Sequence, residues 1–345
     1  MSRTTAGAPA FDAGLAAPGA RSDRAAALAD AALAGDRLAL ARLLTAVENR
    51  TAVAETALRR LYAQAGMAHL VGVTGPPGAG KSTLVAALIA LVRAAGRAVA
   101  VLAVDPSSPI TGGALLGDRV RMQAYADDPD VFIRSMAARG HAGGLASTTM
   151  AAAAVLDATG FDLVLIETVG TGQSEVEVAA AADTTVVLEA PEMGDEVQAI
   201  KAGLLEVADI VVVNKGDRPG AGRTASQLRA MLAAAAPRVA GDDRPRPKRP
   251  EVIVTTASTG EGVAELLALV DRHRTDAAAR GGRARLVRAE AHVWAIVGDR
   301  VRATLTRDPL AAGTASTLAE VADHALDPYS AADRLLAALE RLEDR

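Results

Sequence analysis

Eight consecutive residues have the types and spacing of a phosphate-binding loop. They are Gly75, Pro76, Pro77, Gly78, Ala79, Gly80, Lys81 and Ser82, and Thr83 begins the apolar pattern of a helix after them. These eight residues match the pattern G-x-x-x-x-G-K-S, and an apolar strand precedes them, as that pattern requires. Glycines let successive backbone N–H groups turn toward an anion, and the helix dipole adds positive potential. We expect Lys81 to bind the β- and γ-phosphates of a nucleotide and to act in catalysis, and the Ser82 hydroxyl to bind Mg²⁺.

A second motif directly follows the apolar run at 209–213. It consists of Asn214, Lys215, Gly216 and Asp217. An aspartate carboxylate there can accept two hydrogen bonds from the N1–H and the exocyclic amine of guanine, and adenine offers no matching pair. The Asn-Lys-x-Asp pattern therefore predicts that the chain binds GTP rather than ATP. Thr256, Ala257 and Ser258 directly follow the next expected strand, at 251–255, and are further candidates for contact with the base.

Carboxylates follow two other expected strands. Glu167 ends the strand at 162–167 and Asp105 follows the strand at 98–104. Because the carboxyl ends of parallel strands meet at one edge of a sheet, both are expected near Mg²⁺. Asp118 is a third metal candidate, although it could instead be the N-cap of a helix. The N–H of Gly170 could contact the γ-phosphate, so that its loop would rearrange after hydrolysis.

The residue that positions the attacking water is less evident. No glutamine directly follows Gly170, and Gln173 lies three residues further on. We therefore expect slow intrinsic hydrolysis that a partner accelerates, with Gln173 as a candidate to orient the water. Glu175 could form a catalytic carboxylate pair with Glu167 or could cap a helix.

Composition excludes several classes of function. The chain has 345 residues, a net charge of -4, 2% aromatic residues and no cysteine. Disulfides and cysteine-based sites are therefore excluded, and neither a basic groove nor stacking aromatic side chains support nucleic-acid binding. The sequence shows neither an apolar run long enough to cross a membrane nor the apolar core of a secretory signal. We expect a soluble, cytoplasmic protein without a membrane partner.

Strands alternating with helices predict an α/β fold, a P-loop NTPase with a mainly parallel sheet between helices. The expected strands are at 70–74, 98–104, 131–134, 162–167, 184–189, 209–213 and 251–255. We predict a disordered tail over 1–22, a helical extension over 23–66 that Ser22 caps, a GTPase domain over 67–280 and a helical dimerisation region over 281–345. A helix at 285–306 carries Leu286, Val293 and Trp294, and this apolar face could pack on the core or form a dimer arm.

Several motifs together resemble the MeaB/ArgK family of GTPases. Beside the phosphate loop and the Asn214–Asp217 motif, they are Asp105–Ser108, Arg139-Gly140 with Gly143–Leu145, Glu167–Gly170, Gly172–Glu175, and Gly194–Glu196 with Gln198–Lys201. The resemblance implies a G domain of the SIMIBI class with helical extensions at both ends, a homodimer, and bound GTP or GDP with Mg²⁺. It also implies that Asp105, Asp118 and Glu167 surround the metal.

Members of this family are chaperones of adenosylcobalamin-dependent acyl-CoA mutases, so the resemblance implies such a partner, with methylmalonyl-CoA mutase as the first candidate. A cobalamin adenosyltransferase is a further candidate partner. The segment 191–201 resembles a switch loop that contacts the mutase, and Lys201 would transmit mutase binding to the nucleotide. Glu192-Met193 departs from the small residues that the family usually has at the start of that loop. In the second switch, Thr171 replaces a residue that is commonly valine.

Two other functions compete with this interpretation. A GTP-dependent metallochaperone for a nickel enzyme would share the core, but such proteins usually carry a cysteine or a histidine-rich tract, and this chain has no cysteine and five scattered histidines. The second alternative is an ATP-dependent kinase or ATPase subunit of basic amino-acid transport. The Asn214–Asp217 motif speaks against it, because that motif predicts binding of GTP rather than ATP. Of the two alternatives, the metallochaperone thus shares the GTPase core.

Overall fold

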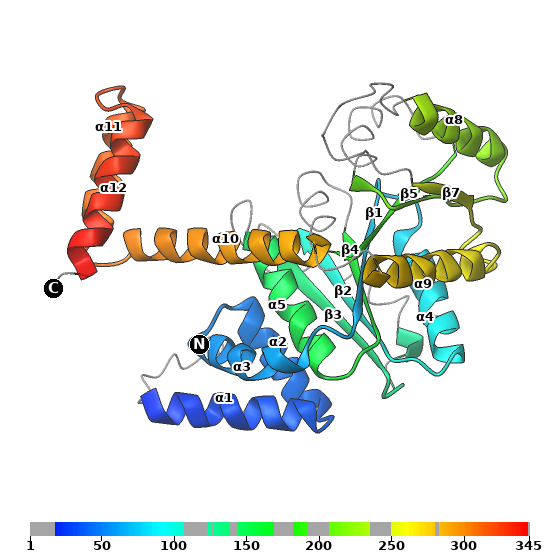
Figure 1. Ribbon diagram of the computed structural model, residues 1–345, viewed down its shortest axis with the longest axis horizontal. Coiled ribbons are helices and arrows are strands. Elements are labelled where there is room, and N and C mark those ends of the chain that lie inside the picture. The colour runs from blue at the N-terminus through cyan, green and yellow to red at the C-terminus, as the bar shows by residue number, and fades with distance from the viewer. Residues whose placement is uncertain are drawn as a thin grey trace, which may run out of the picture.

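The computed structural model describes residues 18–106, 123–125, 127–138, 144–168, 182–191, 207–234, 250–279 and 283–343. These residues contain a seven-stranded sheet with the order β3-β2-β4-β1-β5-β6-β7, in which every pair of neighbours is parallel. The strands are β1 His69–Thr74, β2 Val99–Pro106, β3 Val131–Ala138, β4 Leu163–Thr168, β5 Thr184–Glu189, β6 Ile210–Val213 and β7 Glu251–Val254. The predicted α/β fold with a parallel sheet is therefore confirmed (Figure 1).

The strands form where the sequence has continuous apolar runs. All residues of β4, β5 and β6 are buried, as expected for strands covered on both faces. The predicted strand at 131–134 is too short, because β3 extends to Ala138. Its pairing with β2 continues as far as Pro106 opposite Ala138, so this ladder lengthens a strand whose last residues carry no strong strand signal.

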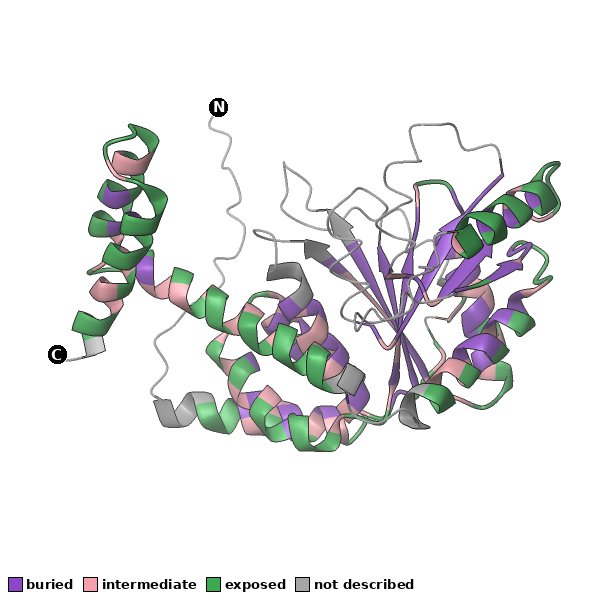
Figure 2. Cartoon of the chain, turned by 45° about the horizontal axis from the view of Figure 1, so that its top comes forward, coloured by how far each residue is buried: buried purple, intermediate pink, exposed green. Residues whose placement is uncertain are grey.

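Helices cover both faces of the sheet (Figure 2). On one face, α4 Lys81–Ala94 and α9 Val263–Ala279 share a core with β1. On the other, α5 Gly144–Ala158 and the N-terminal helices α1 Pro18–Leu33, α2 Arg37–Glu48 and α3 Ala52–Leu61 pack against β2 and β4. A smaller cluster joins α8 Ala221–Ala234 to β5, β6 and β7. The short 3-10 helices η1 Tyr62–Gln64 and η3 Gln123–Tyr125 lie beside α3 and before β3.

The N-terminal helices differ from expectation at one boundary. Helix α1 begins at Pro18 rather than after a cap at Ser22, so it enters the segment expected to be a tail. Proline is tolerated in the first turn, where its missing N–H has no helical partner. Helix α2 is capped at its start, since the Asp36 carboxylate accepts hydrogen bonds from the Leu38 and Ala39 N–H groups.

The C-terminal helices extend away from the sheet. Helix α10 Arg283–Leu305 packs against α5 at one end and leads to α11 Ala311–Ala322 and α12 Pro328–Glu343, which lie side by side beyond the core (Figure 1). No helix in the described part of the chain is both long and apolar enough to span a membrane.

Candidate functional site

The phosphate-binding loop connects the end of β1 to the start of α4. Its first glycine, Gly75, has a φ of 139°, and a Cβ there would lie 2.3 Å from the Leu188 carbonyl oxygen. Gly80 has a φ of 96° and directly precedes α4, and a Cβ there would lie 2.3 Å from the Asn214 amide nitrogen. Both positions therefore need glycine, for backbone conformation and for space.

The predicted lysine and serine of this loop are both buried in the first turn of α4. The Lys81 ammonium donates hydrogen bonds to the Gly75 carbonyl at 2.7 Å and to the Pro76 carbonyl at 3.1 Å, which holds its positive charge over the loop. The Ser82 hydroxyl donates to a Glu167 carboxylate oxygen at 2.7 Å. The structure thus brings a predicted phosphate ligand and two predicted metal ligands to one edge of the sheet.

The remaining metal and switch candidates are described only in part. The backbone of Asp105 lies in β2, one residue before the strand ends, and β2 pairs with the strand that carries Glu167. Asp105 therefore belongs to the same carboxyl edge as Glu167. Asp118, Gly170, Gln173 and Lys201 lie outside the described residues, so their proposed roles stay predictions.

Asn214 connects the phosphate loop to the loop after β7. It is 2% exposed, and its side-chain N–H donates to the Ala79 carbonyl at 2.8 Å. Its side-chain oxygen accepts hydrogen bonds from the Thr255 hydroxyl and the Ala257 N–H, each at 3.1 Å. Three loops that are far apart in sequence are thereby held in one arrangement.

The residues of the second motif line a cavity of about 210 Å³ at this edge. Lys215 begins the turn with a φ of 60°, and the Gly216 N–H donates to the Thr255 carbonyl at 2.9 Å. The residues that line the cavity are Gly80, Thr83, Asn214, Lys215, Asp217, Arg218, Ala257 and Ser258. Most of the predicted base-contacting residues thus surround one space that opens beside the phosphate loop.

Thr256 differs from its two neighbours. It is 3% exposed, and its N–H donates to the Glu261 carbonyl at 2.9 Å. Among the three candidates after β7, only Ala257 and Ser258 line the cavity. The structure therefore assigns Thr256 a part in shaping this loop.

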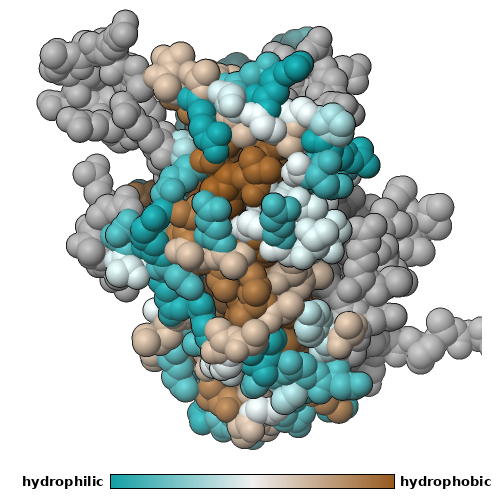
Figure 3. All heavy atoms as spheres, turned by 90° about the vertical axis from the view of Figure 1, so that its right-hand side faces the viewer, coloured by the Kyte–Doolittle hydropathy of each residue, from teal (hydrophilic) through white to brown (hydrophobic). Residues whose placement is uncertain are grey.

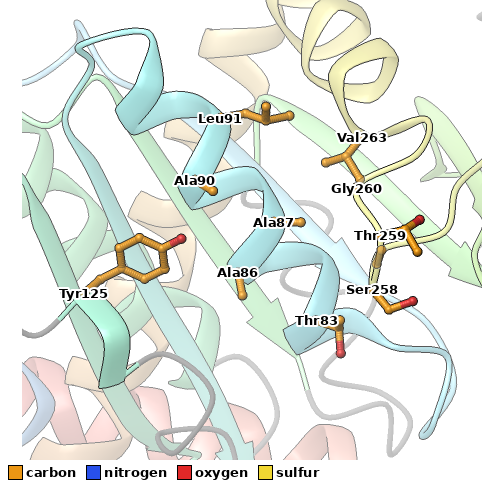
Figure 4. Close-up of a pocket in the computed structure, with 11 residues that line it drawn as sticks. Thr83, Ala86, Ala87, Ala90, Leu91, Tyr125, Ser258, Thr259, Gly260 and Val263 are labelled. Atoms are coloured by element: carbon orange, nitrogen blue, oxygen red, sulfur yellow. The ribbon is translucent and has the colours of Figure 1, made fainter.

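A second, larger cavity of about 410 Å³ shares Thr83, Ala257 and Ser258 with the first. It runs along α4 past Ala86, Ala87 and Ala90, with Tyr125 across the helix from the loop before α9 (Figure 4). On the side of the molecule where α4, α8 and α9 lie, apolar residues form a stripe between hydrophilic edges (Figure 3). None of the described residues that line this cavity is charged, whereas Lys215, Asp217 and Arg218 line the smaller one, so the smaller one is the candidate for the polar edge of a base.

Two residues of the site were not identified from the sequence. Thr255 supplies a hydroxyl to Asn214, and its position directly before the three predicted residues was the available signal. Arg218 lines the cavity and directly follows the Asn214–Asp217 motif. Neither belongs to a motif, so adjacency to predicted residues was the one signal for them in the sequence.

Comparison with known proteins explains this combination of elements. The family described as methylmalonyl-CoA mutase-associated GTPase MeaB matches residues 40–309, which include the phosphate loop and the Asn214–Asp217 motif. The chain belongs to the MeaB family. The chain is 44% identical to the GTPase ArgK of Escherichia coli over 53% of this chain and 56% of that protein. It is a GTPase, and it binds GTP and GDP.

Other relatives cover more of the chain. A protein of Pyrococcus horikoshii named as a GTPase is 46% identical over 88% of this chain and 94% of its own length. The methylmalonic aciduria type A homolog of mouse mitochondria is 35% identical over 88% of this chain and 77% of its own length. A crystal structure titled LAO/AO transport system kinase matches 95% of this chain and all of its own, with a TM-score of 0.65 and 27% identity.

Proposed function

We propose that this GTPase is a chaperone of an adenosylcobalamin-dependent acyl-CoA mutase, with methylmalonyl-CoA mutase as the first candidate. GTP binding and hydrolysis would control the delivery of adenosylcobalamin to the mutase and the protection or reactivation of that enzyme. The observation that carries the proposal is the match of most of the chain to the family of mutase-associated GTPases. The similarity to the methylmalonic aciduria type A homolog supports the same client.

In the proposed mechanism the phosphate loop and α4 hold the nucleotide phosphates. The Lys81 ammonium is buried beside the loop carbonyls and would stabilise the charge that develops on the phosphoryl oxygens during hydrolysis. Asp217 would accept the two N–H groups of guanine, and Asn214 would hold the base loop and the phosphate loop at a fixed separation. Binding of the mutase would then raise turnover by ordering the segments that touch the γ-phosphate.

The described residues fit a Mg²⁺ ion beside the phosphates. The Ser82 hydroxyl and the Glu167 carboxylate are hard oxygen donors that are buried and 2.7 Å apart, which is the ligand type that Mg²⁺ prefers. We propose that Ser82, Glu167 and Asp105 would hold this ion. When bound, Mg²⁺ would neutralise charge on the β- and γ-phosphates.

We also propose that the C-terminal helices form a homodimer. Helix α10 exposes Val293 at 57% and Trp294 at 65%, and α12 exposes Tyr329 at 85%. Apolar side chains on helices that extend beyond the core are typical of an interface with another chain. Trp294→Glu should convert a dimer into a monomer in light scattering, whereas Met231→Glu on α8, which is also exposed, should not. A wild-type monomer at micromolar concentration would contradict this part of the proposal.

The nickel-chaperone alternative has less support in this chain. The sequence has no cysteine, and no group of three or more potential metal-binding side chains gathers among the described residues. A protein that delivers nickel would need imidazole or thiolate ligands for its cargo, since these suit Ni²⁺ better than carboxylates do. The acyl-CoA mutase therefore remains the better candidate for the client.

Steady-state hydrolysis of GTP and ATP, with and without a purified adenosylcobalamin-dependent mutase, tests the proposal. We expect slow hydrolysis of GTP that rises at least about tenfold with the mutase, and little hydrolysis of ATP. Lys81→Ala should abolish turnover in both conditions, while Arg223→Ala, an exposed change on α8, should behave as wild type. GTP turnover that no mutase changes would contradict the chaperone function, and a preference for ATP would contradict the guanine assignment.

A further inference from the structure

The cavity beside the phosphate loop is lined by a cation that no motif accounts for. Arg218 directly follows Asp217 and lines the cavity. Its backbone N–H donates to the Lys215 carbonyl at 2.9 Å, which closes the turn from Lys215 to Arg218. The Arg218 side chain is exposed, and it forms no ion pair or side-chain hydrogen bond with another residue of the described ranges. The turn therefore presents an exposed guanidinium at the rim of the cavity, without a side-chain partner among the residues that the structure describes.

The two sides of this cavity differ in character. Asn214 and Ala257 form a buried inner side and are fixed to each other by a hydrogen bond of 3.1 Å. Asp217 and Arg218 are exposed and form part of the outer rim. A purine whose edge reaches the Asp217 carboxylate would keep one broad face toward this rim. A planar guanidinium can lie flat on such a face, where it gains both stacking and attraction to the π electrons.

We infer that Arg218 is a further nucleotide-binding residue, whose guanidinium covers the exposed face of the bound purine. This inference rests on the proposal that the cavity holds guanine. Stacking acts on the whole ring system and not on one of its substituents. Arg218 thus contributes affinity for any purine held at this site, while Asp217 contributes the preference for guanine. The two neighbouring residues divide the recognition of one base between its face and its edge.

Calorimetric dissociation constants for GDP, GTP and IDP separate the two contributions, because inosine lacks the exocyclic amine of guanine. We expect Arg218→Ala to weaken the binding of all three nucleotides by a similar factor of about 3 to 30. Arg218→Lys keeps the charge but not the planar group, and it should recover only part of the affinity. Asp217→Asn should instead reduce the ratio of the IDP to the GDP dissociation constant. Arg223→Ala is a matched control, since it removes another exposed arginine five residues away.

Each other outcome contradicts a particular step. Unchanged binding in Arg218→Ala, with a reduced IDP to GDP ratio in Asp217→Asn, would overturn the inference and leave the guanine site standing. Full recovery by Arg218→Lys would overturn the stacking contact. A loss confined to GTP would mean that Arg218 touches the γ-phosphate, which also overturns it. If Asp217→Asn leaves the ratio unchanged, the proposed guanine site itself is wrong.

Discussion

Replacement of Asn214 by alanine tests whether this residue holds the two halves of the nucleotide site together. The change removes three hydrogen bonds, one of 2.8 Å to the Ala79 carbonyl and two of 3.1 Å from the Thr255 hydroxyl and the Ala257 N–H. Each bond contributes about 1 kcal/mol net, and partners left buried without a replacement cost more. We therefore expect the free energy of unfolding of the nucleotide-free protein to fall by about 3 kcal/mol.

Urea denaturation followed by circular dichroism measures this change, and Asn49→Ala is the matched control. Asn49 is an exposed residue at the end of α2, and its amide donates to the Thr45 carbonyl at 2.9 Å. Its replacement should cost about 1 kcal/mol or less. The affinity of Asn214→Ala for GDP should also fall by more than about tenfold, since both loops lose their common support. A loss of stability no greater than that of the control would refute the bridging role.

Three further predictions concern single groups. Gly75→Ala should abolish nucleotide binding in a filter-binding assay, because the new Cβ would lie 2.3 Å from the Leu188 carbonyl oxygen; tight GDP binding would contradict this. Ser82→Ala should bind GDP equally in Mg²⁺ and in EDTA, since it removes the hydroxyl that now bonds to Glu167; a persistent Mg²⁺ effect would contradict that role. Burial lowers the pKa of His69 from its usual 6.5 to about 4. The unfolded chain therefore binds this proton at higher pH, and the His69 contribution to stability should fall by about 2 kcal/mol between pH 7.5 and 5; a pH dependence identical to that of His69→Leu in urea denaturation would refute it.

The sequence predicts the sheet well because the signals of buried parallel strands are local. The run Leu163–Ile166 is apolar throughout and becomes a fully buried strand. The start of α1 at Pro18 was missed because Ser22 offered a cap, and a proline fits the first turn equally well. The end of β3 was missed because its last residues are held by pairing with β2, which a local pattern does not contain.

The candidate site divides in the same way. The Lys81 and Ser82 positions follow from a contiguous motif whose backbone geometry is set within eight residues. The contacts of Asn214 with residues more than 40 positions away depend on how three loops meet, so its bridging role could not be deduced from the motif. Arg218 was missed for a related reason, since only the assembled cavity shows which residues form its rim.

Binding of the GTPase to the mutase in each nucleotide state tests the central proposal most directly. Isothermal titration calorimetry would measure the affinity of the full-length GTPase for a purified methylmalonyl-CoA mutase. One titration would contain GDP and the other a non-hydrolysable GTP analogue. The proposed chaperone should bind the mutase in both states with affinities that differ by at least about tenfold. Equal affinities in the two states, or no binding to this or a related acyl-CoA mutase, would contradict the account.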